Sequence, residues 1–267
     1  MKEITGNTRL FGIIADPIYH VKTPQRMNEH FARIGFDGVC VPFHVRPEGL
    51  AAALAGFRTM PNLGGIIVTM PHKSAVLDLV DEVSPVARKI GAANVIRRNA
   101  DGSLYAHMLD GEGFVRGLHD AKIPVAGKTA YLAGAGGAAN AIGFALVQAG
   151  VSVLTIANRT QAKAQDLKER ILSLHPQADI RIGTDDPSGH DLVVNGTSLG
   201  MKATDALPLD VSKLTPAQYV CEVIMEPKIT PLLQAALDKG CPVQYGAPML
   251  ACQIQLMAQM LGVEVES

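Results

Sequence analysis

The chain has 267 residues, of which 48% are hydrophobic and 18% are charged, and its formal net charge is -1. This length suits one large domain or two smaller ones, and the apolar fraction is ample for a packed core. A net charge near zero, with no basic run, excludes the electrostatic footprint of a nucleic-acid-binding protein, because nothing attracts a phosphate backbone.

The first part of the chain alternates short apolar runs with segments of helical periodicity. Strands are predicted over residues 10–16, 39–45 and 64–70, and helices over residues 23–35 and 47–60. Pro24 suits the first turn of the earlier helix, and Gly35 suits the position after its end. This order is typical of an α/β layer with largely parallel strands.

The stretch IIVTMPHK places Lys73 where the third strand ends. A helix is predicted over residues 73–83 from the spacing of its apolar side chains, which are Val76, Leu77, Leu79, Val80 and Val83. A lysine is unusual at that point, because the N-terminal end of a helix macrodipole is positive. Lys73 is therefore either a solvated lysine on a turn or a functional residue.

Beyond residue 90 the pattern indicates a hairpin and then a second α/β half. Strands over residues 93–99 and 103–109 flank Asp101-Gly102, which is a strong turn signal. A boundary is predicted near residue 110, and a new strand, glycine loop and helix follow over residues 128–150. Later strands are predicted within residues 151–160, 178–184, 190–198 and 219–225, and helices over residues 160–174 and 230–240. The segment 248–262 is apolar nearly all round and should form a buried helix, but its pattern does not assign it to either half.

A glycine loop opens the second half. Gly134, Gly136 and Ala139 form a G-x-G-x-x-A arrangement directly after an apolar strand and at the start of a helix. Glycines there allow a tight turn and close backbone approach, and the helix N-terminus then faces a pyrophosphate. A turn that serves packing alone is the alternative, although the strand–loop–helix context favours a dinucleotide site.

The end of the next strand bears on the choice of cofactor. A NAD site usually has an acidic residue there, which bonds the ribose 2′-hydroxyl. This chain has Asn158, Arg159 and Thr160, with Lys163 one turn later. A guanidinium can pair with a 2′-phosphate, so the pattern favours NADP and makes NAD less suitable. The alternative is that Thr160 caps the following helix and Arg159 is merely exposed.

Cysteines and the N-terminus bear on the compartment. The four cysteines, Cys40, Cys221, Cys241 and Cys252, have no metal-type spacing, so no metal site is expected. We expect reduced, buried thiols in a soluble cytoplasmic protein, because the N-terminus lacks an apolar signal region and no segment approaches eighteen apolar residues. Aromatic residues make up only 4% with no Trp, which argues against a base-stacking platform.

Taken together, several segments resemble motifs of the shikimate dehydrogenase family, which includes quinate dehydrogenases. DPIYHVKTP resembles that family's N-P-I-x-H-S-x-S-P, IVTMPHK its N-V-T-x-P-x-K, GAANV its A-x-N-T and MLDGEGF its D-N-x-D-G-x-G-F. GAGGAA, ANRT and VNGTSLGM are similar to motifs of its nucleotide domain, and GAPMLACQ to its C-terminal G-x-x-M-L-x-x-Q. These matches run in family order across almost the whole chain.

The resemblance implies two α/β domains around a cleft, of which the C-terminal one is Rossmann-like. Residues 1–109 and 246–267 would form the substrate-binding catalytic domain, so the last helix would complete the N-terminal domain. Residues 110–245 would form the dinucleotide-binding domain.

The resemblance also implies roles for individual residues. Lys73 matches the catalytic lysine and Asp110 its partner, and oxidising a secondary alcohol requires such a base for the hydroxyl proton. The implied substrate-binding residues are Val21, Thr23, Thr69, Asn94, Met108 and Gln253. The implied cofactor-binding residues are Gly134, Gly136, Gly137, Ala138, Ala139, Asn158, Arg159, Thr160, Lys163, Asn195, Thr197 and Gly246.

Some positions depart from the family pattern and bear on the substrate. Val21 replaces one of two carboxylate-binding hydroxyls, and Thr23 retains the other. Ile67 and Met108 replace two asparagines, and Met225 replaces a tyrosine. These changes predict a more apolar cleft, and a polar substrate group left without its partner would bind less well.

The implied activity is reversible, NADP-dependent hydride transfer to or from a ring carbon of shikimate, 3-dehydroshikimate or a close analogue. Two alternatives stay open, which are the same chemistry on a less polar hydroxy-ring substrate and a non-catalytic nucleotide-sensing regulatory protein. Retention of Lys73 and Asp110 disfavours the second alternative. The expected partner is a small-molecule substrate, with no nucleic acid and no membrane, and the expected state is a monomer or a homodimer.

Overall fold

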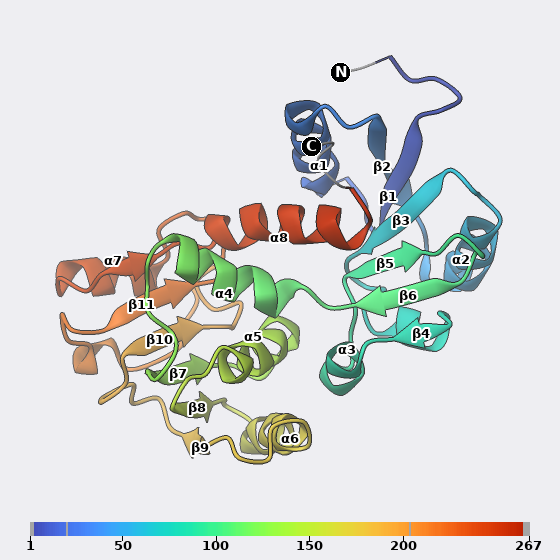
Figure 1. The fold of residues 1–267 in the computed structure, drawn as a ribbon. Helices are drawn as coiled ribbons and strands as arrows, with labels where there is room; N and C mark the ends of the chain where they lie inside the picture. The colour runs from blue at the N-terminus through green and yellow to red at the C-terminus, as the bar shows by residue number, and fades with distance from the viewer. Residues whose placement is uncertain (1–2, 20, 203, 264–267) are drawn as a thin grey trace. The chain divides into compact units, whose positions relative to one another are not determined.

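A computed structural model of the chain describes residues 3–19, 21–202 and 204–263, and its elements are shown in Figure 1. The chain divides into two compact units, Met1–Leu109 with Gln253–Ser267, and Asp110–Cys252. Each unit contains a six-stranded sheet with helices packed on it, so the α/β class predicted from the sequence is confirmed. Among the described residues, no helix is both long and apolar enough to cross a lipid bilayer.

The first unit is built on a mixed sheet with the strand order β2-β1-β3-β5-β6-β4. Its strands are β1 (Arg9–Ala15), β2 (Gly38–His44), β3 (Leu63–Val68), β4 (Glu82–Val83), β5 (Val95–Arg98) and β6 (Leu104–His107). β1 pairs in parallel with β2 and β3, whereas β5 is antiparallel to β3 and β6. The predicted hairpin around Asp101-Gly102 is confirmed. Gly102 has a φ of +87°, a backbone conformation that would be strained in a residue with a side chain.

Helices cover this sheet and close its core. They are α1 (Thr23–Ile34), η1 (Pro47–Gly49), α2 (Leu50–Arg58), η2 (Ala75–Asp78) and α3 (Pro85–Ile90). α1 begins with Pro24 in its first turn and ends at Gly35 with a φ of +73°, as the sequence predicts. The end of α8 (Ala247–Met260) contributes Ile254 and Met257 to the cluster that contains Phe11, so burial of the last helix is confirmed for this part.

The prediction of a helix over residues 73–83 is wrong. Only the four residues of η2 are helical there, in a 3-10 turn, and Glu82–Val83 pairs instead with β6. Asp81 accepts a hydrogen bond from the backbone N–H of Leu104 at 2.7 Å and also pairs with Arg58. Strand pairing and these long-range bonds therefore replace a helix that the apolar spacing alone favoured.

On the edge strand β2, the backbone N–H groups that face outward from Gly38 to Pro42 are either engaged or missing. The side-chain amide of Asn28 donates to the carbonyl of Cys40 at 2.9 Å and accepts from the N–H of Cys40 at 2.8 Å. The N–H of Gly38 donates to the carbonyl of Phe36 at 3.1 Å, and Pro42 has no N–H.

The second unit has an all-parallel sheet with the order β12-β11-β10-β7-β8-β9. Its strands are β7 (Thr129–Ala133), β8 (Val153–Ala157), β9 (Ile180–Gly183), β10 (Leu192–Asn195), β11 (Tyr219–Glu222) and β12 (Val243–Gln244). In chain order this is 3-2-1-4-5-6, the doubly wound arrangement of dinucleotide-binding folds, with its switch point between β7 and β10.

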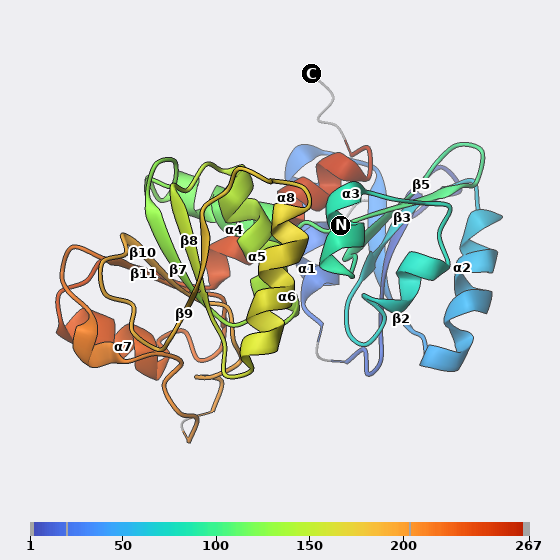
Figure 2. The same ribbon diagram turned by 90° about the horizontal axis from the view of Figure 1, so that it is seen from below.

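The helices of this unit are α4 (Asp110–Asp120), α5 (Gly137–Gln148), α6 (Gln161–Leu172), η3 (Val211–Lys213) and α7 (Pro231–Asp238). α5 and α6 pack on β7, β8 and β9, whereas α7 packs on β11 and β12 (Figure 2). Tyr131, Val193 and Leu233 are fully buried members of its core. The sequence predicts every strand here except β12, which has only two residues.

Candidate functional site

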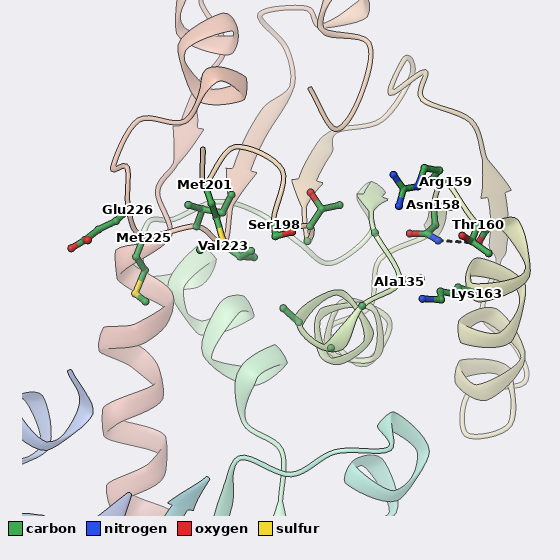
Figure 3. A pocket seen from close by; sticks show the side chains of 17 residues that line it. Ala135, Asn158, Arg159, Thr160, Lys163, Ser198, Met201, Val223, Met225 and Glu226 are labelled. Atoms are coloured by element: carbon green, nitrogen blue, oxygen red, sulfur yellow. Dashed lines mark hydrogen bonds between the residues drawn. The ribbon is translucent and has the colours of Figure 1, made fainter. Parts of the chain in front are cut away.

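The second unit contains a cavity of about 600 Å³ at the carboxyl ends of β7, β8, β10 and β11 (Figure 3). Doubly wound sheets bind ligands at this edge, next to the switch point. The lining residues are Gly134, Ala135, Gly136, Gly137, Ala138, Asn158, Arg159, Thr160, Lys163, Gly196, Thr197, Ser198, Met201, Val223, Ile224, Met225 and Glu226.

The glycine loop forms the middle of the cavity. Gly134 has a φ of +113°, and its N–H donates to the carbonyl of Ala157 at 2.7 Å. A Cβ on Gly134 would lie 3.0 Å from the Cγ2 atom of Thr197, so a side chain would press on the opposite wall. A Cβ on Gly136 or Gly137 would meet open space, and α5 begins here. The loop therefore leaves room for a group that approaches the N–H groups at a helix N-terminus, as a pyrophosphate does.

One end of the cavity is basic. Arg159 and Lys163 are exposed and line it, and among the described residues neither has an ion-pair partner. Asn158 donates from Nδ2 to the carbonyl of Thr160 at 2.9 Å, which shapes the turn into α6. Thr160 occupies the N-cap position of α6 without a side-chain capping bond, so capping does not account for this segment. A neighbouring cavity shares Asn158 and Arg159 and continues past the end of β9 to Thr184.

The other end of the cavity is more apolar. Figure 3 shows Met201, Val223 and Met225 there, away from Arg159 and Lys163. These side chains and Glu226 come from the loops after β10 and β11. The sequence motifs assign no ligand role to Val223, Ile224 or Glu226. Only their position indicates a role, because all three follow the carboxyl end of β11, the neighbour of β10 at the switch point.

Three of the implied cofactor residues lie behind the cavity wall. Ala139 and Asn195 are fully buried, and Asn195 Oδ1 accepts hydrogen bonds from Thr197 N and from Thr197 Oγ1, at 3.0 and 2.7 Å. Gly246 packs so closely that an added Cβ would collide with the carbonyl oxygen of Ile224. The other nine, from the glycine loop to Lys163 and Thr197, line the cavity.

In the first unit, Thr69 follows β3, Asn94 precedes β5, and backbone hydrogen bonds hold Thr69 and Lys73 near these strand ends. The N–H of Thr69 donates to the carbonyl of Ile14 at 3.2 Å, and the carbonyl of Lys73 accepts from the N–H of Ala93 at 2.8 Å. Asn94 is 1% exposed, and its Oδ1 accepts from the N–H of Leu109 at 2.9 Å. Lys73 itself is half-buried.

The remaining implied residues are distributed over both units. Asp110 is the buried first residue of α4 in the second unit, and the next residue, Gly111, packs against the backbone of α5. In the first unit, Met108 and Gln253 are buried and Thr23 begins α1. Val21 packs against the core and lines a separate groove with Ile18 and Pro24.

Comparisons with known proteins agree with this architecture. Residues 13–96 match a family model described as the shikimate dehydrogenase substrate binding domain, and residues 118–181 match one described as shikimate / quinate 5-dehydrogenase. A shikimate dehydrogenase (NADP(+)) of Rubrobacter xylanophilus is 41% identical over 254 residues, covering 94% of this chain and 89% of that protein. The corresponding protein of Geobacter metallireducens is 39% identical over 259 residues, covering 94% and 90%.

Solved structures extend the likeness to the fold. A shikimate dehydrogenase in complex with NADP+ has a TM-score of 0.90 and 30% identity, covering 98% of this chain and 93% of that one. A 5-ketofructose reductase of Gluconobacter has a TM-score of 0.88 and 31% identity, covering 97% and 94%. The family models, the curated relatives and the shared fold give one answer: the chain belongs to the shikimate dehydrogenase family.

Proposed function

We propose that the protein is an NADP-dependent dehydrogenase that interconverts a ring hydroxyl and a ketone of shikimate, 3-dehydroshikimate or a close analogue. The observation that carries the proposal is the cavity that joins an open glycine loop to two cations, Arg159 and Lys163. An NADP molecule would require both features, because it has a pyrophosphate and a 2′-phosphate. The relatives named shikimate dehydrogenase (NADP(+)) support the same choice.

The cofactor residues have distinct parts in this proposal. Gly136 and Gly137 admit the pyrophosphate to the N-terminus of α5, and Arg159 with Lys163 holds the 2′-phosphate. The nicotinamide end then falls at the apolar end of the cavity, beside Val223 and Met225. Bound NADP+ would supply the hydride acceptor in oxidation, and bound NADPH would supply the hydride donor in reduction.

The proton steps fall to the substrate residues. We assign to Lys73 the removal of the proton from the substrate hydroxyl oxygen during oxidation and its return during reduction. Asp110 would hold the reacting hydroxyl by a hydrogen bond, and Asn94 and Gln253 would hold ring hydroxyls. The substrate site would also be lined by Val21, Thr23, Thr69 and Met108. The missing helix after Lys73 removes the macrodipole as a factor, so the role of Lys73 rests on the family motif and the chemistry.

A second substrate class has specific support. Val21, Ile67 and Met108 lack the polar groups of the family pattern, and Ile67 and Met108 are buried. One structural relative with 31% identity is a 5-ketofructose reductase, which is named for an uncharged ketose derivative. A less polar hydroxy or keto compound is therefore the alternative to shikimate.

The test is to follow the absorbance of NADPH while screening ring alcohols and ketones, with shikimate, quinate and neutral polyols in parallel. Turnover of shikimate supports the main proposal, and turnover of only neutral compounds supports the alternative. Tight NADPH binding without turnover of any of them would favour a nucleotide-sensing regulatory protein instead.

We further propose that the protein works on small molecules in the cytoplasm as a monomer or a homodimer, without nucleic acid or membrane. All four cysteines are free and buried, and burial raises the pKa of Cys40 and Cys221 to about 12. Such thiols persist in a reducing compartment. Light scattering after gel filtration would decide the oligomeric state.

A further inference from the structure

A buried carboxylate lies at the end of β11, outside the lining of the cavity described above. Glu222 is fully buried, and its two oxygens accept hydrogen bonds from Asn195 Nδ2 at 3.1 and 3.0 Å. Oε1 also accepts from the N–H groups of Val223 and Ile224, at 2.8 and 3.1 Å, and Oε2 accepts from the hydroxyl of Thr230 at 2.9 Å. All of these donors are neutral. Burial raises the pKa of Glu222, and the hydrogen bonds oppose that shift.

One side of Glu222 fixes the loop after β10. Asn195 turns its Nδ2 toward Glu222 and toward the carbonyl of Leu199 at 3.1 Å, which leaves Oδ1 for Thr197. A flipped amide would point a donor at the N–H of Thr197 and its oxygen at the carboxylate, so the carboxylate sets the amide orientation. Thr197 lines the cavity, and Glu222 therefore acts on that wall through one intermediate residue.

The other side of Glu222 fixes the segment after β11. Val223 and Ile224, whose N–H groups it binds, line the apolar end of the cavity. Gly246 packs against the same segment from its carbonyl side, where there is no room for a side chain beside the Ile224 oxygen. Thr230, whose hydroxyl also donates to Glu222, caps α7 by accepting from the N–H of Leu233 at 3.3 Å.

We propose that Glu222 is a positioning residue that holds in register the two cavity walls formed by the loops after β10 and β11, and so sets where the nicotinamide half of the cofactor binds. The inference rests on the proposed function, in which this cavity binds NADP(H). A carboxylate suits the task because it only accepts hydrogen bonds and offers about four lone-pair directions to converging donors. Arg159 and Lys163 lie at the far end of the cavity, so their contacts with a ligand should not depend on Glu222.

The experiment compares NADPH with adenosine 2′,5′-bisphosphate, which has the 2′-phosphate but no nicotinamide. In Glu222→Gln, an amide N–H₂ must face a donor, either Asn195 or a backbone N–H. We expect the Kd for NADPH to rise by about 10-fold or more, the scale of an unsatisfied buried donor, and the Kd for the bisphosphate to change by less than about 2-fold. The fluorescence of bound NADPH, which reports the surroundings of the nicotinamide, should shift as well.

Two further variants separate positioning from general damage. Asp191→Asn removes a carboxylate from the opposite end of the same sheet, where it accepts from Thr129, and should leave both Kd values unchanged. The exchange Asn195→Asp with Glu222→Gln restores a donor–acceptor pair with the charge moved to residue 195. It should recover about 3-fold or more of the lost NADPH affinity, measured as a double-mutant cycle.

The outcomes are distinct. Equal weakening of NADPH and the bisphosphate, or no weakening of either in folded Glu222→Gln, would overturn the positioning role. If Glu222→Gln does not fold, Glu222→Asp, which keeps the charge but shortens the reach, provides the same ratio of Kd values. A wild-type protein that binds neither NADPH nor the bisphosphate would instead contradict the proposed function.

Discussion

At the scale of single residues, the proposed preference for NADP rests on Arg159. We predict that Arg159→Ala weakens NADP binding by about 1.5–3 kcal/mol, because a charge-assisted hydrogen bond to the 2′-phosphate is lost. NAD has no such phosphate, so its Kd should stay within about 2-fold. Calorimetric titration with both cofactors measures the difference.

A matched control lies one strand away. Arg181 on β9 is exposed, pairs with Asp179 at 2.6 Å and does not line the cavity. Arg181→Ala should leave both affinities unchanged. Equal affinity of the wild type for NADP and NAD would contradict the assignment of Arg159.

Lys73 and Asp110 carry the proposed proton transfer. We predict that Lys73→Ala and Asp110→Asn each lower kcat by about 100-fold or more, the scale of general acid–base catalysis. Both variants should keep the Kd for NADPH within about 2-fold, since neither residue lines the cavity at the glycine loop. Steady-state rates with the best substrate from the screen provide the measurement, and unchanged kcat in Lys73→Ala would remove the proposed mechanism.

Val21 and Met108 bear on the substrate. We predict that shikimate or quinate is turned over with a high KM, because one hydroxyl, Thr23, remains where the family pattern offers two. Loss of one donor to a charged group costs about 1.5–3 kcal/mol, or roughly 10- to 150-fold in affinity. Val21→Ser combined with Met108→Asn should recover part of the loss in kcat/KM for shikimate.

Val21 also packs against the core of the first unit, so a control must remove its methyl groups without adding a hydroxyl. Val21→Ala serves this purpose and should recover nothing. A wild type that already reaches about 10⁵ M⁻¹s⁻¹ with shikimate, as ordinary biosynthetic enzymes do, would show that the apolar replacements leave the site unchanged.

At the scale of elements, Asp191 ties the start of β7 to the start of β10. The N–H of Thr129 donates to its Oδ2 at 2.9 Å and is the main cause that lowers the pKa of Asp191 below its ordinary 3.8, with the Thr129 hydroxyl and Lys128 assisting. A carboxyl with a lowered folded-state pKa stabilises the fold above the unfolded-state pKa and loses that effect as pH falls through the folded value.

We therefore predict that Asp191→Asn lowers Tm at about pH 7, and that this deficit shrinks below about pH 4 as the wild-type carboxyl becomes protonated. Thermal unfolding of both proteins across this range, followed by circular dichroism, measures the effect. A deficit that does not depend on pH would mean that shape, and not charge, makes the contribution.

The elements differ in how far the sequence could predict them. β7, the glycine loop and α5 form as predicted, because strand propensity, turn chemistry and helix periodicity agree over one continuous segment. The helix predicted over residues 73–83 does not form, since its apolar spacing competes with pairing to β6, which lies more than twenty residues later. The pattern of apolar residues also missed α3 beside it, although Ser84, Pro85 and Gly91 supply its cap, first turn and end.

The site shows the same division. The place of Arg159 and of the glycines on the cavity wall could be predicted, because a short motif fixes their position after a strand; their contacts with NADP stay a prediction. The place of Glu222 could not be predicted, because its proposed role comes from a fold that brings Asn195 and Thr230 to its two oxygens. No local pattern in VCEVIM encodes that convergence.

At the scale of the whole molecule, thermal unfolding can test which of the two compact units binds the cofactor. We predict that NADPH at about 100 times its Kd stabilises the fold by about 2.7 kcal/mol. The cavity lies within residues Asp110–Cys252. If the two units unfold in separate transitions, only the transition of this unit should move to a higher temperature. Differential scanning calorimetry shows whether there are one or two transitions and which of them NADPH moves.

The same measurement with NADH and with Arg159→Ala provides the controls. Both should give a smaller rise in Tm at equal ligand concentration, since NADH lacks the 2′-phosphate and the variant lacks the guanidinium that would bind it. No rise with NADPH would contradict cofactor binding in this cavity, and an equal rise with NADH would contradict the role assigned to Arg159.

The engaged edge of β2 also limits how copies of the molecule can associate. A strand that joins a sheet edge needs free N–H and C=O groups at alternate positions along it. Gly38 and Cys40 already use their N–H groups, Asn28 covers both groups of Cys40, and Pro42 has none to offer. A strand from another chain therefore finds no N–H donor along this stretch. Strand addition is the first step of cross-β growth and of fused intermolecular sheets, so crowded copies of the protein are protected from templating one another there.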